Sequence, residues 1–164
     1  MSVPVPTNDE MRRALGRFAT GVTVITAFDS CGTLCGLTAN AFSAVSLDPP
    51  LVLACVDRAV RCYQAINTSG VFTVHILHAD QSDVASGFAR KGGDRSQICD
   101  WSVTKDGRPL LSQFHAALEC RLHEAHPGGD HAIVVGRVER VHEQAVDSKP
   151  LLYYRGQIFP LRVS

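Results

Sequence analysis

Several features that mark membrane, secreted or nucleic-acid-binding proteins are missing from this 164-residue sequence. No apolar run approaches the ~20 residues that a membrane-spanning helix needs. The first ten residues, MSVPVPTNDE, lack the basic and apolar regions of a signal peptide. Sixteen basic residues balance sixteen acidic ones, so the net charge favours neither nucleic acid nor an anionic membrane surface. We therefore expect a soluble, cytoplasmic protein with no nucleic-acid or membrane partner.

The motifs of the commonest nucleotide-binding and hydrolytic sites are missing as well. The sequence has no GxGxxG or GxxxxGK[ST] loop and no GxSxG elbow. If a nucleotide binds to this chain, we expect it to bind in neither a Rossmann nor a P-loop manner.

The cysteines and histidines do not form a metal-binding pattern. Cys31 and Cys35 have no second pair at zinc-ligand spacing. His123 and His126 are three residues apart, so on a strand their side chains point to opposite faces. Without a signal peptide, free thiols are the expected state of the six cysteines. We expect no bound metal.

The hydrophobic pattern predicts one mostly β domain with short helices, spanning residues 1–164. A capping residue, Thr7 or Asn8, begins a helix that is expected to end at Gly21. Two further helices are predicted at 59–70 and 80–91. Strands are predicted at 21–27, 35–46, 51–56, 71–77, 117–125 and 131–143, with an irregular segment at 92–109 and an extended tail at 150–159. Because most strands follow one another through hairpins, the pattern favours a small antiparallel barrel over a doubly wound sheet.

Three stretches carry candidate binding groups, and each also has an ordinary structural interpretation. TANA at 38–41 offers a hydroxyl, an amide and a backbone left open by its alanines, but small residues also relieve crowding in a barrel strand. GGDH at 128–131 permits a tight turn that aims His131, or it is a plain hairpin. PLLYYRG at 150–156 places two aromatic rings beside an arginine, which suits a base or a phosphate but also suits a packed edge strand.

The motifs TANAFSAVSLDPPLVLACVDR, FxVHIL…Q…FARK, GGDHxIVVGRV and PLLYYRG occur in this order between about residues 10 and 158. Together they resemble the flavin reductase family with the flavin-binding split-barrel fold. More narrowly, they are similar to the reductase components of two-component flavin-dependent monooxygenases. The resemblance implies a small antiparallel Greek-key (split) β-barrel that forms a homodimer, with flavin near the subunit interface.

Carried over position by position, the resemblance implies four groups of site residues. The isoalloxazine ring is expected against Thr38, Ala39, Asn40 and Ala41. The ribityl and phosphate region corresponds to Ser46, Cys55, Val56, Asp57 and the helix start near Ala59, where a helix N-terminus attracts phosphate. The segment that closes over the phosphate end is Phe88, Ala89, Arg90 and Lys91. The nicotinamide side corresponds to His131, Tyr154, Arg155 and Gly156.

One departure from the family pattern concerns the phosphate or adenosine wall. The chain has Val60-Arg61-Cys62 where the family often has Ser-x-Thr, so two hydroxyls are missing and Arg61 is the candidate to compensate. This leaves FAD and FMN both open, with FAD favoured. NADH is favoured over NADPH as hydride donor. The candidates to bind a 2′-phosphate are Arg90, Arg95, Arg108 and Arg155.

The activity that the resemblance implies is NAD(P)H:flavin oxidoreductase. Hydride passes from the nicotinamide C4 to the flavin N5, and reduced flavin then leaves for a partner monooxygenase. Because the flavin carries this chemistry, it asks little of protein side chains. His131 is expected to position the nicotinamide or protect the hydride path. The alternatives are a flavoprotein with tightly bound prosthetic flavin and another electron acceptor, and a non-catalytic flavin-binding barrel.

Overall fold

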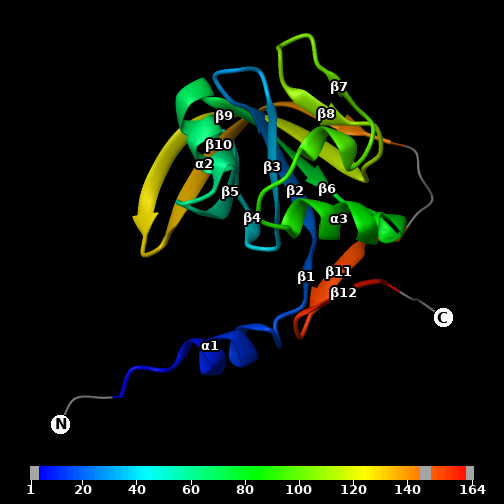
Figure 1. Cartoon of the computed structure of the whole chain (residues 1–164). Coiled ribbons are helices and arrows are strands. Elements are labelled where there is room, and N and C mark those ends of the chain that lie inside the picture. Colours follow the sequence, from blue (N-terminus) through cyan, green and yellow to red (C-terminus); the bar gives the residue numbers. More distant parts are fainter. Residues whose placement is uncertain (1–3, 145–148, 162–164) are drawn as a thin grey trace.

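The chain folds into antiparallel sheets flanked by short helices, as a computed structural model describes for residues 4–144 and 149–161 (Figure 1). The strands are β1 (Thr20–Gly21), β2 (Thr23–Phe28), β3 (Leu34–Ala39), β4 (Phe42–Leu47), β5 (Pro50–Asp57), β6 (Val71–Ile76), β7 (Trp101–Val103), β8 (Pro109–Leu111), β9 (Ala116–Gly128), β10 (His131–Glu143), β11 (Leu151–Tyr154) and β12 (Gln157–Pro160). The helices are α1 (Asn8–Leu15), α2 (Arg61–Ser69) and α3 (Ser82–Ala89), with 3-10 turns η1 (Ala79–Gln81) and η2 (Arg95–Gln97). Over these described ranges, none of the helices has the length and apolarity to cross a bilayer.

The main sheet has seven strands in the order β3-β2-β6-β9-β10-β5-β4, and β1-β11-β12 and β7-β8 form two smaller sheets. Every pairing that the structure gives is antiparallel. The three sheets remain separate and do not close into one continuous barrel within the described residues. The expected mostly β, antiparallel fold with short helices is therefore confirmed, and the open sheets agree with a split barrel.

Two clusters of buried side chains fill the fold. The larger joins Ile25, Phe72 and Val134 of the central strands to Ile66 of α2. The second joins Val24, Leu77, Phe88 and Leu151, and so fastens α3 and β11 to the main sheet. Because alternate residues of a strand point to one face, these clusters follow the period of two in the sequence. The second cluster also fixes the position of the turn that follows β11.

Several segments differ from the sequence predictions. The strand predicted at 35–46 divides into β3 and β4, because the chain turns at Asn40 and Ala41. The first helix ends at Leu15 with Gly16 as its C-cap, because the chain there turns to pair β1 with β11; Gly21 lies in β1 instead. The segment 92–109, predicted to be irregular, contains most of a β7–β8 hairpin. The tail at 150–159 is a hairpin of β11 and β12 and not one extended strand. The helix at 59–70 is confirmed, with Gly70 in the left-handed conformation at its end.

His75 of β6 is a buried histidine that joins three strands. Its Nε2 accepts a hydrogen bond from the backbone N–H of Leu111 at 3.1 Å, so its Nδ1 carries the proton and donates to the carbonyl of Val24, also at 3.1 Å. Burial lowers the pKa of His75 from 6.5 to about 4. The neutral ring is therefore the form that fits this site.

We expect His75 to make the folded chain sensitive to mild acid. Between pH 6.5 and 4 the unfolded chain protonates this ring and the folded chain does not, so the free energy of unfolding falls as the pH falls. The contribution of His75 across this window is about 3 kcal/mol. Urea unfolding at pH 7 and pH 4.5 measures the loss, and the His75→Gln variant, weaker at pH 7, should lose less on acidification. Equal losses in the two proteins would remove His75 as the cause.

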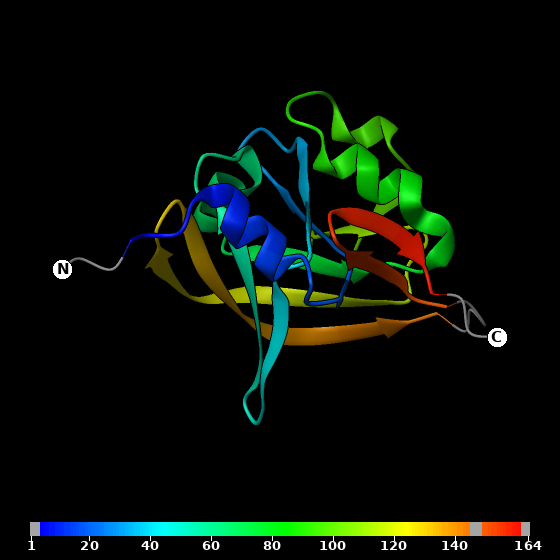
Figure 2. The ribbon, with the colours of Figure 1, turned by 90° about the horizontal axis from the view of Figure 1, so that it is seen from below.

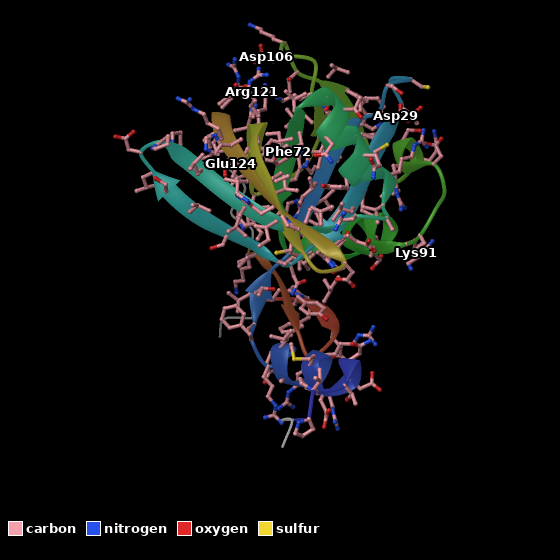
Figure 3. All side chains as sticks on the ribbon, turned by 90° about the vertical axis from the view of Figure 1, so that its left-hand side faces the viewer. Asp29, Phe72, Lys91, Asp106, Arg121 and Glu124 are labelled. Atoms are coloured by element: carbon pink, nitrogen blue, oxygen red, sulfur yellow. The ribbon has the colours of Figure 1, made fainter. Side chains whose placement is uncertain are left out.

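A buried charge cluster fastens the β7–β8 hairpin to the long β9–β10 hairpin. It consists of Thr104, Arg108, Glu119, Glu139 and His142, and Arg108 and Glu119 are 1% and 0% exposed. The alternation of β9 places Glu119 on the face opposite Cys120, and the β7–β8 hairpin covers that face. The neighbouring Asp106 and Arg121 mark this end of the molecule, which lies farthest from α1 (Figure 3).

Candidate functional site

A cavity of about 980 Å³ lies between α1 and the barrel. Figure 1 shows α1 set apart from the sheets, and Figure 2 shows it crossing the end of the barrel. The cavity is lined by Arg12, Arg13, Leu15, Gly16, Arg17, Phe18, Thr20, Asn40, Ala41, Phe42, Ser43, Leu53, Cys55, Tyr153, Arg155 and Gly156. Four segments therefore build it: α1 with the chain that follows, the β3–β4 connection, β5, and the turn between β11 and β12.

Helix α1 forms the roof of the cavity. It has a well-capped N-terminus and few contacts with the barrel. Thr7 caps α1 through a capping box, in which its Oγ1 accepts from the N–H of Glu10 and the Glu10 carboxylate accepts from the N–H of Thr7. None of the α1 residues is buried. At its end, the Gly16 carbonyl accepts a hydrogen bond of 2.8 Å from the N–H of Arg155. The helix is thus tied to the β11–β12 turn while its apolar side stays open.

The floor of the cavity is the tight connection from β3 to β4. The carbonyl of Asn40 accepts from the N–H of Phe42 at 3.0 Å, and the carbonyl of Ala41 accepts from the N–H of Cys55 at 2.9 Å. These bonds hold the small residues of this connection against β5. Leu53 and Cys55 are two residues apart, so both side chains lie on the face of β5 that lines the cavity. The result is a fixed wall with little side-chain bulk at Ala41.

The cavity is cationic and holds an unpaired hydroxyl. Four of its lining residues are arginines and none is acidic. Thr20 Oγ1 is buried and has no hydrogen-bond partner in the described part of the chain. A buried polar atom without a partner costs roughly 1–3 kcal/mol, which a polar ligand would recover. The apolar rings and chains beside these groups suit a large ligand that is flat in one part and anionic in another.

Comparisons with known proteins identify the family. A family model described as "Flavin reductase like domain" matches residues 15–162. The chain belongs to the flavin reductase like domain family. The resemblance inferred from the sequence motifs is therefore confirmed.

Named relatives of this flavin reductase like domain include reductase subunits. The chain is 42% identical over 149 residues to "Stachydrine N-demethylase reductase subunit Stc3" of Rhizobium meliloti, covering 91% of this chain and 64% of that protein. It is 41% identical over 146 residues to "Flavin-dependent monooxygenase, reductase subunit HsaB" of Mycobacterium tuberculosis, covering 88% of this chain and 78% of that protein. The chain spans about half, 49%, of the length of a further Rhizobium meliloti relative.

Solved structures of similar proteins share the fold. The structure of "Streptomyces globisporus C-1027 NADH:FAD oxidoreductase SgcE6 in complex with NAD and FAD fragments" matches with a TM-score of 0.89 and 34% identity, covering 99% of this chain and 98% of that chain. This likeness extends over both the barrel and the N-terminal segment. The split-barrel expectation for this flavin reductase like domain agrees with that match.

Five of the predicted site residues line the cavity: Asn40, Ala41, Cys55, Arg155 and Gly156. Tyr154 lies beside them with its ring under the Arg155 guanidinium. Thr38 and Ala39 immediately precede the cavity floor but do not line the cavity. The Thr38 hydroxyl donates to the carbonyl of Ala85 in α3 at 2.6 Å, and the buried Ala39 offers its carbonyl to the Thr23 hydroxyl.

His131 does not line the cavity, but it shares a face of the main sheet with the lining residue Cys55. It is opposite Asp57 in the β5–β10 ladder, and directly opposed residues share a face of the sheet. Cys55 lies two residues from Asp57 on that face, a distance of about 7 Å along the strand. The ring Nδ1 of His131 is 2.8 Å from a carboxylate oxygen of Asp130, and this contact lowers the pKa of Asp130.

The residues expected in the ribityl and phosphate region follow β5 into α2. The N–H of Ala59 donates to the Asp57 carboxylate at 2.8 Å, which shapes the approach to the helix. Arg61 is ion-paired with Asp29 of the β2–β3 connection. The pKa of Asp29 is lowered first by the backbone hydrogen bond from Thr33 and then by the Arg61 guanidinium. Val56 is buried in the core, so only its backbone is open to a ligand. Ser46 lies beyond the cavity on β4.

The segment 88–91 divides into one buried and three exposed residues. The Phe88 ring packs in the core so closely that a side chain at Gly36 would stand 2.5 Å from it. The exposed residues are Ala89, Arg90 and Lys91. The carbonyl of Arg90 accepts a hydrogen bond from the guanidinium of Arg95. None of these four residues lines the cavity, and their contact with a ligand stays a prediction.

The sequence reasoning missed most of the cavity roof. Arg12, Arg13, Arg17, Phe18 and Thr20 line the cavity, but nothing in a linear pattern of helix and strand shows that they converge. The signal that was available is the stripe of Met11, Leu15 and Phe18, whose apolar side chains lie interleaved with arginines. All six cysteines are free. In residues 4–144 and 149–161, no group of three or more His, Cys, Asp or Glu side chains is placed to hold a metal ion.

Proposed function

We propose that this chain is an NAD(P)H-dependent flavin reductase that supplies reduced flavin to a separate flavin-dependent monooxygenase. The observation that carries the proposal is the large cationic cavity, floored by Asn40 and Ala41, in a member of the flavin reductase like domain family. The name of the HsaB relative describes the reductase subunit of such a monooxygenase. The name of the SgcE6 structure describes NADH:FAD oxidoreductase with NAD and FAD fragments bound.

The chain's own residues have three tasks in this function. When bound, the flavin supplies the chemistry of accepting hydride from the nicotinamide. The small residues at 40–41 leave room for a flat ring against the backbone, and Leu53 and Phe42 exclude water from one side. The unpaired Thr20 hydroxyl is available to hydrogen-bond a polar edge. Thr38, Ala39, Ser46, Val56, Asp57, Ala59, Arg61, Tyr154 and residues 88–91 remain proposed contributors around this cavity.

His131 is proposed to position the nicotinamide at the cavity rim. Its ring is half-exposed and hydrogen-bonded to Asp130, so it is oriented but accessible. Replacing it with alanine should raise the KM for the nicotinamide nucleotide more than it lowers kcat. Unchanged kcat and KM for both NADH and NADPH would remove His131 from the site.

FAD and NADH are the proposed preferences. Two of the arginines considered for a 2′-phosphate are engaged elsewhere: Arg108 is buried with Glu119, and Arg95 donates to backbone carbonyls. This reduces the means of recognising NADPH. A homodimer is also proposed, because Met11, Val45 and Leu47 leave apolar surface exposed on α1 and the β4–β5 hairpin. Sedimentation equilibrium that gives the monomer mass at all concentrations would contradict the dimer.

The function is tested by an anaerobic assay of the purified chain. NADH or NADPH is mixed with FAD, FMN or riboflavin, and the absorbance of oxidised flavin is followed. We expect bleaching that depends on the protein and saturates with added flavin, fastest with NADH and FAD. Flavin that stays at full occupancy through purification would favour a tightly held prosthetic group. Absence of bleaching despite flavin binding would leave a non-catalytic flavin-binding barrel.

A further inference from the structure

The cavity under α1 concentrates positive charge, although the net charge of the whole chain is zero. Its four cationic lining residues are Arg12, Arg13, Arg17 and Arg155, and it has no acidic lining residue. The whole chain has 16 basic and 16 acidic residues. A cleft lined by one sign of charge, with apolar walls, raises the local concentration of the opposite ion. The cavity is therefore suited to an anionic ligand.

Most other arginines have a carboxylate or carbonyl partner, whereas three of the four in the cavity have none among the described residues. Guanidinium partners elsewhere are carboxylates or backbone carbonyls, at Arg61, Arg95, Arg108, Arg121 and Arg140. In the part of the chain that the structure describes, the guanidinium groups of Arg13 and Arg17 have no ion-pair or hydrogen-bond partner. The Arg155 guanidinium lies 5.2 Å from the centre of the Tyr154 ring and has no carboxylate partner there. Arg12 differs, since it lies 3.5 Å from the Asp9 carboxylate.

The backbone at Arg155 is an unfavourable place for an arginine. Its φ is 50° and that of Gly156 is 79°, which makes the turn between β11 and β12 left-handed at both central residues. Such turns favour Asn and Gly. A left-handed backbone is unfavourable for a residue with a Cβ atom, because this atom comes too close to the following carbonyl oxygen. Backbone preference therefore does not account for an arginine at position 155. The place of its side chain in the cavity wall does account for it.

The turn between β11 and β12 also brings Arg155 close to Arg13 and Arg17. The N–H of Arg155 donates to the carbonyl of Gly16 at 2.8 Å, next to Arg17. Arg13 lies in the last turn of α1, and Arg17 follows Gly16, the C-cap of this helix. Both residues line the cavity, so their like charges lie around the same space and repel each other. An anion between these side chains and Arg155 would remove that repulsion.

We propose that Arg13, Arg17 and Arg155 bind the diphosphate of a dinucleotide. This inference rests on the proposed function and names the residues that hold the charged part of its substrate. Guanidinium groups match phosphate oxygens through paired hydrogen bonds, so three of them suit two linked phosphates. The apolar lining residues Leu15 and Phe18 lie beside them and suit the rings at either end of such a ligand. FAD and NAD(P)H both carry this diphosphate.

The test measures equilibrium binding without turnover. Isothermal titration compares FAD with riboflavin, and NAD⁺ with nicotinamide mononucleotide, because the second ligand of each pair lacks the diphosphate. The proteins are the full chain, the double variant Arg13→Gln/Arg17→Gln, and Arg155→Asn, which keeps a residue that tolerates the left-handed turn. Arg137→Gln is the matched control, since Arg137 is an exposed arginine of β10 that does not line the cavity.

We expect the cavity variants to weaken binding of a dinucleotide by about 10- to 100-fold, as loss of charged hydrogen bonds implies. The affinities for riboflavin and nicotinamide mononucleotide, and all affinities of Arg137→Gln, should stay within about twofold. A loss for FAD assigns the site to the flavin, and a loss for NAD⁺ assigns it to the hydride donor. Unchanged FAD and NAD⁺ affinities, or an equal loss for riboflavin, overturn the inference.

The two proposals fail separately. If the unmodified chain reduces flavin but the variants bind both dinucleotides normally, the diphosphate site is wrong and the reductase function stands. If the unmodified chain reduces no flavin but the variants lose affinity for FAD selectively, the diphosphate site stands and the reductase function is wrong.

Discussion

Replacing Glu119 with alanine should lower the free energy of unfolding by about 3–5 kcal/mol. Its carboxylate is 0% exposed and accepts hydrogen bonds from Thr104 Oγ1 at 3.0 Å, Arg108 Nη1 at 3.0 Å and His142 Nε2 at 2.6 Å. Burial raises the pKa of Glu119, but these hydrogen bonds lower it further, so the pKa lies below its ordinary value. The variant leaves the buried Arg108 with only two partly exposed carboxylate partners, Glu139 and Asp106, and leaves a cavity where the carboxylate was. Urea unfolding measures the change.

Two comparisons identify the cause of that loss. Glu139→Ala removes a carboxylate that also pairs with Arg108 but is partly exposed, so it should cost clearly less than Glu119→Ala. Replacing the buried pair together, Arg108→Met with Glu119→Leu, removes both charges and should recover much of the stability. If the double variant is no more stable than Glu119→Ala, the loss comes from packing and not from an unpaired charge.

Replacing Ala41 with tryptophan should abolish most activity while the fold persists. Ala41 is exposed on the cavity floor, and its carbonyl is bonded to the N–H of Cys55, so the new ring would project from a fixed backbone. A ring of this size fills space that a flat ligand needs, and we expect kcat/KM for flavin to fall by about 100-fold or more, equivalent to about 2.7 kcal/mol of transition-state stabilisation. The anaerobic flavin-reduction assay measures the loss.

Ala44→Trp is the matched control for this prediction. Ala44 is also exposed and lies three residues further along the chain, on β4, but it does not line the cavity. It should keep kcat/KM within about threefold and a normal circular dichroism spectrum. Equal activity of the two variants would show that the cavity floor is not where flavin binds.

The barrel was predictable because its strands alternate or carry β-branched runs, and because hairpins join most neighbours. Gly70 and the GGDH turn marked element ends that the structure places within a residue or two. The β7–β8 hairpin was missed because strands of three residues leave no period to detect. Glu119 shows a second limit: an alternating strand gives two faces, but it does not show that the preceding β7–β8 hairpin covers the polar face.

The residues of the site also divide into those that the sequence predicted and those that it did not. Residues 40–41 and the Arg155-Gly156 turn were found because they lie in motifs that resemble the flavin reductase family, whereas their local patterns alone left an ordinary structural interpretation open. The arginines near the end of α1 were missed because their role depends on where a helix at the start of the chain meets a turn near its end. No local pattern encodes a contact between Gly16 and Arg155. Such long-range juxtapositions are set by tertiary packing, here by the second core cluster that fixes β11.

Because α1 has few contacts with the barrel, the part of the chain that stabilises the fold is separate from the part that covers the cavity. None of the α1 residues is buried, whereas the sheets and the charge cluster contain the buried contacts. A helix of eight residues has little stability of its own in water, so lifting it disturbs few contacts of the barrel. The cavity wall formed by the barrel is consequently rigid, whereas the wall formed by α1 can move away. In the function proposed above, such an exit would help the release of reduced flavin, because departure would not require the barrel to loosen.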